Sequence, residues 1–273
     1  MKVAYLGPDG TFSRQAADIL CPDSEKIPFS TFTEVLGACQ DGKADQAVVP
    51  IENSIEGVVN ASIDELVFEK ELYIQEILNL PIEQNLMAKK GTRIEDVKKI
   101  ISHSHAIPQC KNFLKTLPEA VIETVSSTGE GARLASIAEG NNVAAVGNKA
   151  AADIYGLEIL KSSIQDNKNN ITRFARVSAT PTIDYENKQK QTIAFSTLDE
   201  PGALYGVLEI FSVYGINLSD IFSRPMKNRL KEYVFVVDID INNNIDDIKQ
   251  AIKLMERKSS FIKVLGIYSE ISP

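Results

Sequence analysis

The chain has 273 residues, 44% of them hydrophobic, and a net charge of −8. That length fits two domains or one large domain, and the apolar content is enough for a sizeable core. The acidic balance argues against a nucleic-acid partner, because no segment concentrates lysine and arginine enough to follow a phosphate backbone. The nearest basic run, residues 227–231, is interpreted as a solvated turn.

The few cysteines and histidines argue against a metal site. Cys21, Cys39 and Cys110 are widely spaced, and His103 and His105 share one short segment. Neither pattern has the spacing of a structural zinc site, so we expect reduced thiols and no metal site. The first residues carry no secretory signal pattern, and no window approaches about 20 apolar residues. We therefore expect a cytoplasmic protein without a membrane partner.

Residues 1–178 alternate between strand and helix patterns, which predicts an α/β domain with mainly parallel sheets. The predicted strands are 2–7, 46–53, 72–90, 97–103, 120–127 and 142–148. The predicted helices are 11–20, 31–43, 62–68, 106–117, 129–140 and 149–156. Thr11 or Ser13 can cap the first helix, Thr33 can cap the second, and Gly156 can end the last.

The pattern changes after residue 178. Residues 179–191 carry prolines and charges without an apolar period and are interpreted as an interdomain linker. Beyond them the predicted strands are 191–198, 216–225, 232–241 and 261–268, and the predicted helices are 202–215 and 245–258. This βαββαβ order predicts a ferredoxin-like domain over 192–273. Such small sheets often pair edge to edge, so we expect a homodimer or homotetramer.

Polar clusters follow several predicted strands of the first domain. GPDGTFS places Thr11 and Ser13 at a helix start, where unpaired N–H groups and the helix dipole attract anions. In PIENS, Asn53 and Ser54 lie at the end of a predicted strand, and in SST, Ser127 and Thr128 have the same position. Ligands of α/β sheets bind at the carboxyl ends of strands, so these clusters are candidate contacts. Each also fits an ordinary helix cap or loop.

The segment NITRF combines a hydroxyl, a cation and an aromatic ring in Thr172, Arg173 and Phe174. The planar guanidinium of Arg173 matches a carboxylate bidentately, and Phe174 can exclude water. Thr172 can hand a proton to a departing hydroxide when a strong hydrogen-bond donor is near. The same residues also fit a strand with an exposed arginine. A Ser–His–Asp triad is not supported, and His103 is interpreted as a core or capping histidine.

These segments resemble the prephenate dehydratase family in their order and spacing. The catalytic part of the resemblance is carried by GPDGTFS, PIENSIEGVV, SHSHAIPQC, SST, AAADIYGL and DNKNNITRF. PGALYGVL and INLSDIFSRP resemble the ACT regulatory domain that follows the catalytic domain in that family. The resemblance covers essentially the whole chain. It implies a two-lobed catalytic domain at 1–178, similar to periplasmic binding proteins, with crossings near residues 80 and 165, and an ACT domain at 192–273.

The family converts prephenate to phenylpyruvate, with loss of water and carbon dioxide and without a cofactor. The resemblance implies that Thr172 is the catalytic residue that protonates or polarises the leaving hydroxyl. It implies substrate contacts from Arg173, Phe174, Thr11, Ser13, Asn53, Ser54, Ser127 and Thr128. It implies allosteric phenylalanine binding between two ACT domains by Gly202, Ala203, Leu204, Asn217, Leu218 and Ser219. Glu52 is expected to orient Asn53 or a loop amide, and the segment with His103, Ala106, Gln109 and Cys110 is expected to be mainly structural.

Two departures and two alternatives remain open. The usual Glu-Ser-Arg-Pro reads Phe222-Ser223-Arg224-Pro225, which leaves the strength and sign of phenylalanine regulation open. SSTGEG also replaces the commoner SSTA start. Arogenate dehydratase is an alternative activity, because arogenate differs from prephenate only in an amino group in place of a keto group. A non-catalytic amino-acid sensor is an alternative of another class, disfavoured by the pairing of Thr172 with Arg173.

Overall fold

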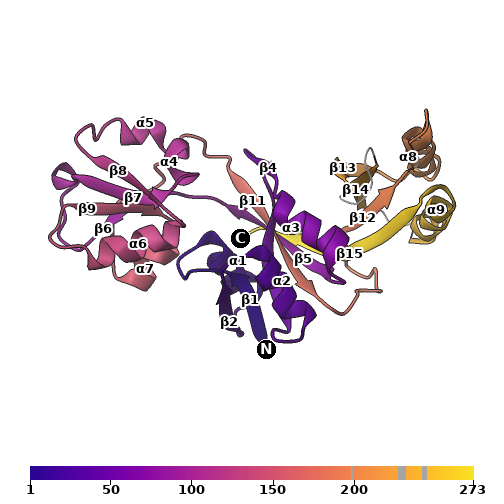
Figure 1. The fold of residues 1–273 in the computed structure, drawn as a ribbon, viewed down its shortest axis with the longest axis horizontal. Coiled ribbons are helices and arrows are strands. Elements are labelled where there is room, and N and C mark those ends of the chain that lie inside the picture. The colour runs from indigo at the N-terminus through magenta and orange to yellow at the C-terminus, as the bar shows by residue number, and fades with distance from the viewer. Residues whose placement is uncertain (198, 227–231, 242–244) are drawn as a thin grey trace.

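The computed structural model describes residues 1–197, 199–226, 232–241 and 245–273. They form two lobes and a C-terminal domain that lie in a row (Figure 1). Lobe 1 is residues 1–81 and 171–178, lobe 2 is residues 82–170, and the C-terminal domain is residues 190–273. The turn predicted at 227–231 and residue 198 of a predicted strand lie outside the described residues. No helix in these described ranges is long and apolar enough to cross a membrane.

Lobe 1 is an α/β layer whose sheet has the order β5-β11-β3-β1-β2. Strand β1 is parallel to β2 and β3, whereas β11 is antiparallel to β3 and β5. The elements of lobe 1 are β1 (Lys2–Leu6), α1 (Phe12–Leu20), β2 (Glu25–Phe29), α2 (Phe32–Gln40), β3 (Gln46–Asn53), β4 (Gly57–Val58), α3 (Asn60–Asp64), the π-helix η1 (Glu65–Glu69), β5 (Tyr73–Pro81) and β11 (Ile171–Ser178).

Local chemistry explains the start of both lobe 1 helices. Thr11 caps α1 by accepting the N–H of Arg14 at 3.2 Å. Helix α2 begins with a capping box, in which Thr31 and Glu34 each accept a backbone N–H from the other end of the turn. The predicted cap at Thr33 is therefore wrong by two residues. Strand β2 was not predicted, because Pro28 and flanking charges hide the pattern; as an edge strand, β2 tolerates proline.

Lobe 2 has a sheet of its own, ordered β10-β6-β9-β7-β8. Strand β7 is parallel to β8 and β9, while β6 is antiparallel to β9 and β10. The helix predicted at 106–117 is two short helices, because the backbone at Cys110 leaves the helical region. The elements are β6 (Asn85–Ala88), the 3-10 helix η2 (Ile94–Asp96), β7 (Lys99–His103), α4 (Ala106–Gln109), α5 (Lys111–Leu114), β8 (Val121–Val125), α6 (Thr128–Ile137), β9 (Val143–Gly147), α7 (Lys149–Tyr155) and β10 (Glu158–Lys161).

Two antiparallel segments connect the lobes. The chain leaves lobe 1 after β5 and returns at β11. The outgoing N–H of Ile82 donates to the Asn170 carbonyl at 2.8 Å, and the returning N–H of Ile164 donates to the Gln84 carbonyl at 2.8 Å. The crossing segments therefore form a short paired hinge between the lobes.

The C-terminal domain follows the predicted βαββαβ order. It consists of β12 (Lys190–Ser196), α8 (Ala203–Val213), β13 (Leu218–Pro225), β14 (Tyr233–Asp240), α9 (Ile245–Lys258) and β15 (Phe261–Ile271). Its strands are ordered β13-β14-β12-β15, and both helices contribute to one apolar cluster with the sheet. The fold prediction is confirmed: a two-lobed α/β part is followed by a ferredoxin-like domain. Both lobe sheets are mixed, because the crossing strands run antiparallel to their neighbours.

The C-terminal domain shares its sheet with lobe 1. Strand β15 pairs in parallel with β5, with Glu270 opposite Ile77 and Ile271 opposite Leu78. This pairing joins the two sheets into one of ten strands within the described residues. Gly266 lies at the junction, where a Cβ atom would overlap the backbone oxygen and nitrogen of Ile74. Glycine is therefore required for the two backbones to approach.

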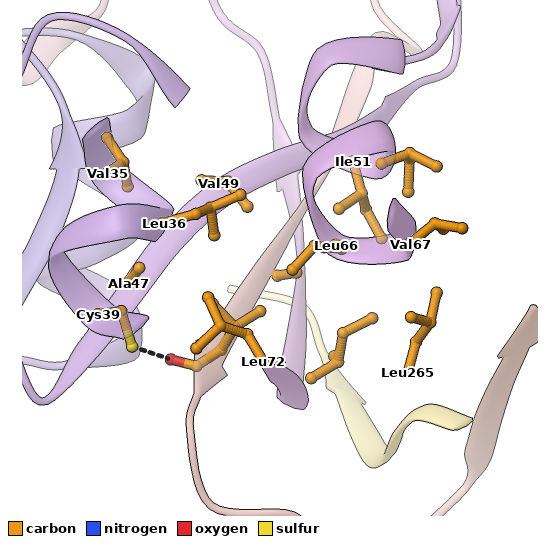
Figure 2. Packing of buried hydrophobic residues seen from close by; sticks show 14 of the residues in the cluster. Val35, Leu36, Cys39, Ala47, Val49, Ile51, Leu66, Val67, Leu72 and Leu265 are labelled. Carbon is orange, nitrogen blue, oxygen red and sulfur yellow. Dashed lines mark hydrogen bonds between the residues drawn. The ribbon is translucent and has the colours of Figure 1, made fainter. Parts of the chain in front are cut away.

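A common apolar core accompanies the common sheet. Leu265 of β15 packs in the cluster that contains Leu36, Leu66 and Leu72 of lobe 1 (Figure 2). The same cluster includes Ala194, Val234, Val236 and Tyr268 of the C-terminal domain. The Cys39 thiol lies at its edge and donates to the Val177 carbonyl. Lobe 1 and the C-terminal domain are thus built as one packed unit.

Candidate functional site

A cavity of about 300 Å³ lies between the two lobes. It is lined from the loop after β1, the end of β3, the outgoing crossing segment, strand β11, and the ends of β7 and β8. Because carboxyl ends of parallel strands meet at one sheet edge, distant motifs converge there. Of the residues predicted to contact substrate, those that line the cavity are Thr11, Ser13, Asn53, Ser127, Thr128, Thr172 and Phe174.

Two helix N-termini, one from each lobe, face this cavity. Thr11 and Ser13 lie at the start of α1, and Ser127 and Thr128 lie at the start of α6. Each helix start presents unpaired N–H groups and the positive end of a dipole, which favours an anion. No lysine or arginine of the described residues lines the cavity. An anion in the cavity would therefore be held by fixed dipoles and hydroxyls contributed by both lobes.

Asn53 sets the orientation of the Thr172 hydroxyl. The side-chain oxygen of Asn53 accepts the N–H groups of Ile55 and Glu56 at 2.9 and 3.0 Å, which fixes the amide. Its NH₂ group then donates to Thr172 Oγ1 at 2.9 Å. Since an NH₂ group has no lone pair to accept a proton, the Thr172 hydroxyl must donate elsewhere. Thr172 is 8% exposed and lines the cavity, where a ligand hydroxyl can receive that proton.

A chain of side-chain amides extends this contact across the hinge. Asn53 also donates to Asn170 Oδ1 at 2.8 Å, and Asn170 donates to Gln109 Oε1 at 3.3 Å. Gln84 donates to the same Gln109 oxygen at 3.4 Å, and the Gln84 Oε1 atom is buried without a partner in the described structure. The chain therefore links lobe 1, both crossing segments and helix α4 of lobe 2. Gln109 and Gln84 also line the cavity.

Sequence reasoning assigned no role to Gln84 or Asn170 and gave Gln109 only a structural one. The signal for Gln109 was present in the SHSHAIPQC segment, which belongs to the resemblance. Asn170 lies two residues before Thr172 in the same NITRF region. Gln84 offered no signal, because its position on the outgoing crossing is set only by the three-dimensional fold.

The two histidines lie on the lobe 2 wall of the cavity. His105 Nδ1 lies 3.3 Å from Glu56 Oε2, and the His103 ring packs edge-on against His105. Burial lowers the pKa of His103, the nearby His105 lowers it further, and Glu56 opposes this shift. His103 is therefore held toward its neutral form. His103 Nδ1 accepts the backbone N–H of His105 at 3.3 Å where α4 begins, so His103 has the capping role that was one of its two predicted roles. It lines the cavity rather than lying in a core.

The structure corrects the predicted role of Arg173 as a clamp for a substrate carboxylate. Thr172 and Phe174 line the cavity but Arg173 does not, because alternate residues of a strand face opposite sides. Arg173 instead pairs with Glu52 at 3.0 Å, Asp238 at 3.0 Å and Glu270 at 2.6 Å. Glu52 thus binds Arg173, whereas it was predicted to orient Asn53 or a loop amide.

Ser54 is also absent from the cavity lining. Its hydroxyl donates to the Asn169 carbonyl at 3.2 Å and accepts the Ile171 N–H at 2.9 Å. Ser54 therefore fastens the end of β3 to the returning crossing segment. This contact holds the Thr172 strand in register without reaching a ligand.

The lobes touch directly beside the cavity. Tyr155 of α7 donates to the Asp9 carbonyl at 3.1 Å, and a Cβ atom on Gly10 would lie 3.1 Å from Ala151. A Cβ atom on Gly129 would overlap the Asp9 carbonyl. Glycine at 129, where the resemblance leads one to expect alanine, thus permits this close approach of α6 to the Gly7–Gly10 turn.

Known proteins show the same organisation. A family model described as prephenate dehydratase matches residues 3–182. The prephenate dehydratase of Bacillus subtilis is 37% identical over 282 residues, which covers 98% of this chain and 98% of that protein. The chain belongs to the prephenate dehydratase family.

Two further relatives of the family extend the comparison. Arogenate dehydratase/prephenate dehydratase 2 of Arabidopsis thaliana is 34% identical, with 98% of this chain and 72% of that protein covered. The crystal structure of a prephenate dehydratase from Arthrobacter aurescens in complex with L-phenylalanine has a TM-score of 0.89 and 33% identity. That match covers 98% of this chain and 90% of the other. The prephenate dehydratase fold therefore extends through the C-terminal domain.

The residues predicted to bind an effector fall into two groups in this family member. Gly202, with φ of 84°, precedes α8, and Ala203 and Leu204 are the first residues of that helix. Asn217 precedes β13, which begins with Leu218 and Ser219. Helix α8 has 11 residues and is about 16 Å long, so the two groups lie toward its opposite ends. One chain alone does not bring them together.

The altered Ser-Arg-Pro segment contacts lobe 1. Phe222 packs against the core shared with lobe 1, in place of the charge usual in the family. Arg224 binds Asp64 with contacts of 2.7 and 3.0 Å and donates to Asn60 Oδ1 at 2.7 Å. Strand β13 is thereby joined to helix α3, which follows the Asn53 loop.

Proposed function

We propose that this protein converts prephenate to phenylpyruvate, with loss of water and carbon dioxide, under allosteric control by phenylalanine. The observation that carries the proposal is the Thr172 hydroxyl, held by Asn53 at the wall of a cavity that two helix N-termini face. Membership of the prephenate dehydratase family supports the same reaction. The reaction class is that of a carbon–oxygen lyase.

The proposed binding mode follows from the charge of prephenate. The substrate carries two carboxylates and one ring hydroxyl, so it needs two anion sites and a proton donor between them. The start of α1 supplies one anion site and the start of α6 supplies the other. Because these helices belong to different lobes, a dianion would draw the lobes together. Phe174 and Phe12 add an apolar wall that limits water.

In the proposed chemical step Thr172 acts as the general acid. The carbon–carbon bond to the ring carboxylate breaks, its electron pair moves into the ring, and the ring carbon–oxygen bond breaks as the aromatic ring forms. The departing hydroxide takes the Thr172 proton and leaves as water, and solvent restores the threonine hydroxyl. Asn53 assists because its N–H bond to Oγ1 stabilises the oxygen as the proton departs.

The proposed regulation uses a second copy of the chain. The two groups of predicted effector residues lie at opposite ends of α8, so a complete site needs one group from each of two C-terminal domains. A relative bound to L-phenylalanine supports phenylalanine as the ligand. The proposal therefore includes a homodimer or a dimer of dimers. The three free, buried cysteines support the proposed cytoplasmic location.

Arogenate dehydration is the second candidate activity, supported by the relative from Arabidopsis thaliana named for both substrates. The deciding experiment is a side-by-side assay of the purified protein with prephenate and with arogenate, each with and without phenylalanine and in the presence of a chelator. We expect phenylpyruvate from prephenate, suppressed by phenylalanine. A faster reaction with arogenate than with prephenate would make arogenate the substrate. If neither compound gave a product, only the alternative of a non-catalytic amino-acid sensor would be left.

A further inference from the structure

Arg173 is bound by carboxylates from two domains. Its side chain is 17% exposed and pairs with Glu52 of β3, Asp238 of β14 and Glu270 of β15. One guanidinium therefore holds a strand of lobe 1 and two strands of the C-terminal domain. Since the planar guanidinium offers five N–H donors in a fixed fork, a lysine could not make the same set of contacts.

Asp238 ties this group to the region predicted to bind the effector. Its Oδ1 atom accepts the Thr192 hydroxyl at 2.5 Å, and Thr192 is hydrogen bonded to Tyr268 at 2.9 Å. The main-chain oxygen of Asp238 accepts the Ser219 hydroxyl at 3.3 Å. Ser219, Asp238 and Arg173 thus form a continuous polar path that ends beside Thr172.

Negative charge exceeds positive charge around Arg173. Desolvation, Glu52 and Asp238 together raise the pKa of Asp220, which faces the same group. Lys190 lies 4.0 Å from Glu270 and 3.7 Å from Asp240, so it only partly balances the excess. Removal of Arg173 would leave Glu52, Asp238 and Glu270 to repel one another across the domain boundary. The position of β11 therefore depends on how these carboxylates are arranged.

We propose that Arg173 is a positioning residue through which the C-terminal domain sets the orientation of Thr172. The inference rests on the proposed function. Movement of β14 or β15 on phenylalanine binding would shift Asp238 and Glu270, and Arg173 would transmit that shift to β11. Thr172 directly precedes Arg173 in the chain, so the Thr172 hydroxyl would leave the direction required for proton donation while the substrate contacts at α1 and α6 remain.

The test compares Arg173→Met with Arg176→Met. Arg176 lies on the same strand, is similarly buried at 23% exposure and pairs with Glu76. Its side-chain partners, Glu76 and Gln46, both belong to lobe 1. We expect Arg173→Met to lower kcat by about 10- to 100-fold with KM changed by less than about threefold. We expect it also to abolish inhibition by phenylalanine while calorimetry still detects phenylalanine binding. Arg176→Met should keep the wild-type phenylalanine response.

Neutral isosteres keep the test valid if Arg173→Met fails to fold. Asp238→Asn and Glu270→Gln each remove one charge partner, and each should weaken phenylalanine inhibition by about five- to 150-fold at unchanged phenylalanine affinity. Inhibition equal to the wild type in both variants would overturn the inference, as would equal effects from Arg173→Met and Arg176→Met. Absence of turnover in the wild type would instead refute the proposed function.

Discussion

The two lobes that enclose the cavity are held in different ways. Lobe 1 shares a ten-stranded sheet and an apolar core with the C-terminal domain, whereas lobe 2 has its own sheet and its own apolar clusters. Lobe 2 is joined to the rest by two paired crossing segments and by contacts beside the cavity. Lobe 1 and the C-terminal domain should therefore stay together when the cavity closes, and closure should be a movement of lobe 2.

This difference predicts that lobe 1 serves the chemical step and lobe 2 serves substrate binding, and substitution of Thr172 should give the largest effect. Thr172 belongs to the shared body, so its loss should affect the chemical step rather than binding. Thr172→Ala is expected to lower kcat by about 10²- to 10⁴-fold with little change in KM. Thr172→Ser keeps the hydroxyl and should retain most activity. Steady-state kinetics with circular dichroism as a fold control measure this, and a fully active alanine variant would remove Thr172 as the general acid.

Gly266 tests whether the shared sheet makes one body. Its Cβ would overlap Ile74 backbone atoms, so Gly266→Ala must separate β15 from β5. We expect a loss of about 3 kcal/mol in unfolding free energy and weaker phenylalanine inhibition. Gly37→Ala is the matched control, because a Cβ there meets open space within helix α2 and should stabilise by up to about 1 kcal/mol. Equal unfolding free energies in the two variants would argue for independent bodies.

Thr128 tests the predicted role of lobe 2 in substrate binding. It begins α6 in lobe 2 and lines the cavity, so it should serve binding more than chemistry. Thr128→Val is expected to raise KM about tenfold, the effect of one lost hydrogen bond of roughly 1.4 kcal/mol, while kcat stays within about threefold. Thr128→Ser should restore the wild-type KM. A fall in kcat without a change in KM would assign Thr128 to the chemical step.

His103 provides the smallest expected effect and reports on the lobe 2 wall of the cavity. Its pKa in the folded protein lies below the ordinary value of 6.5, chiefly because of burial. The unfolded chain therefore binds more protons than the folded one as the pH falls below about 6.5, and stability is lost in that window. Urea unfolding on either side of that pH should show a smaller loss for His103→Gln than for the wild type. An identical loss in both would contradict the shifted pKa.

Much of the fold could be predicted from the sequence because its signals are local. Alternation of strand and helix patterns, the Gly156 helix end and the βαββαβ order all depend on residues within one element or its neighbours. The pairing of β15 with β5 could not be predicted, because strand patterns identify buried faces and not partners. It depends on Gly266, whose meaning is visible only beside Ile74.

The site was predicted in part for the same reason. Clusters at strand ends and helix starts converge by a general rule of α/β sheets, so Thr11, Asn53, Thr128 and their neighbours were found. Arg173 was misassigned because three consecutive residues cannot face one cavity from a single strand, whose side chains alternate. The amide chain through Gln109 was missed because its members meet only across the hinge.

The pairing of β15 with β5 also has a consequence for how the protein reaches its fold. Ser269 lies opposite Glu76, roughly 190 residues away along the chain, so this contact has a very long closure path. During synthesis the edge of β5 must wait unpaired while all of lobe 2 and most of the C-terminal domain are made. A strand edge that stays exposed for that time can pair with other chains. Variants that slow the formation of β15 should therefore aggregate in the cell even where the purified protein keeps its activity.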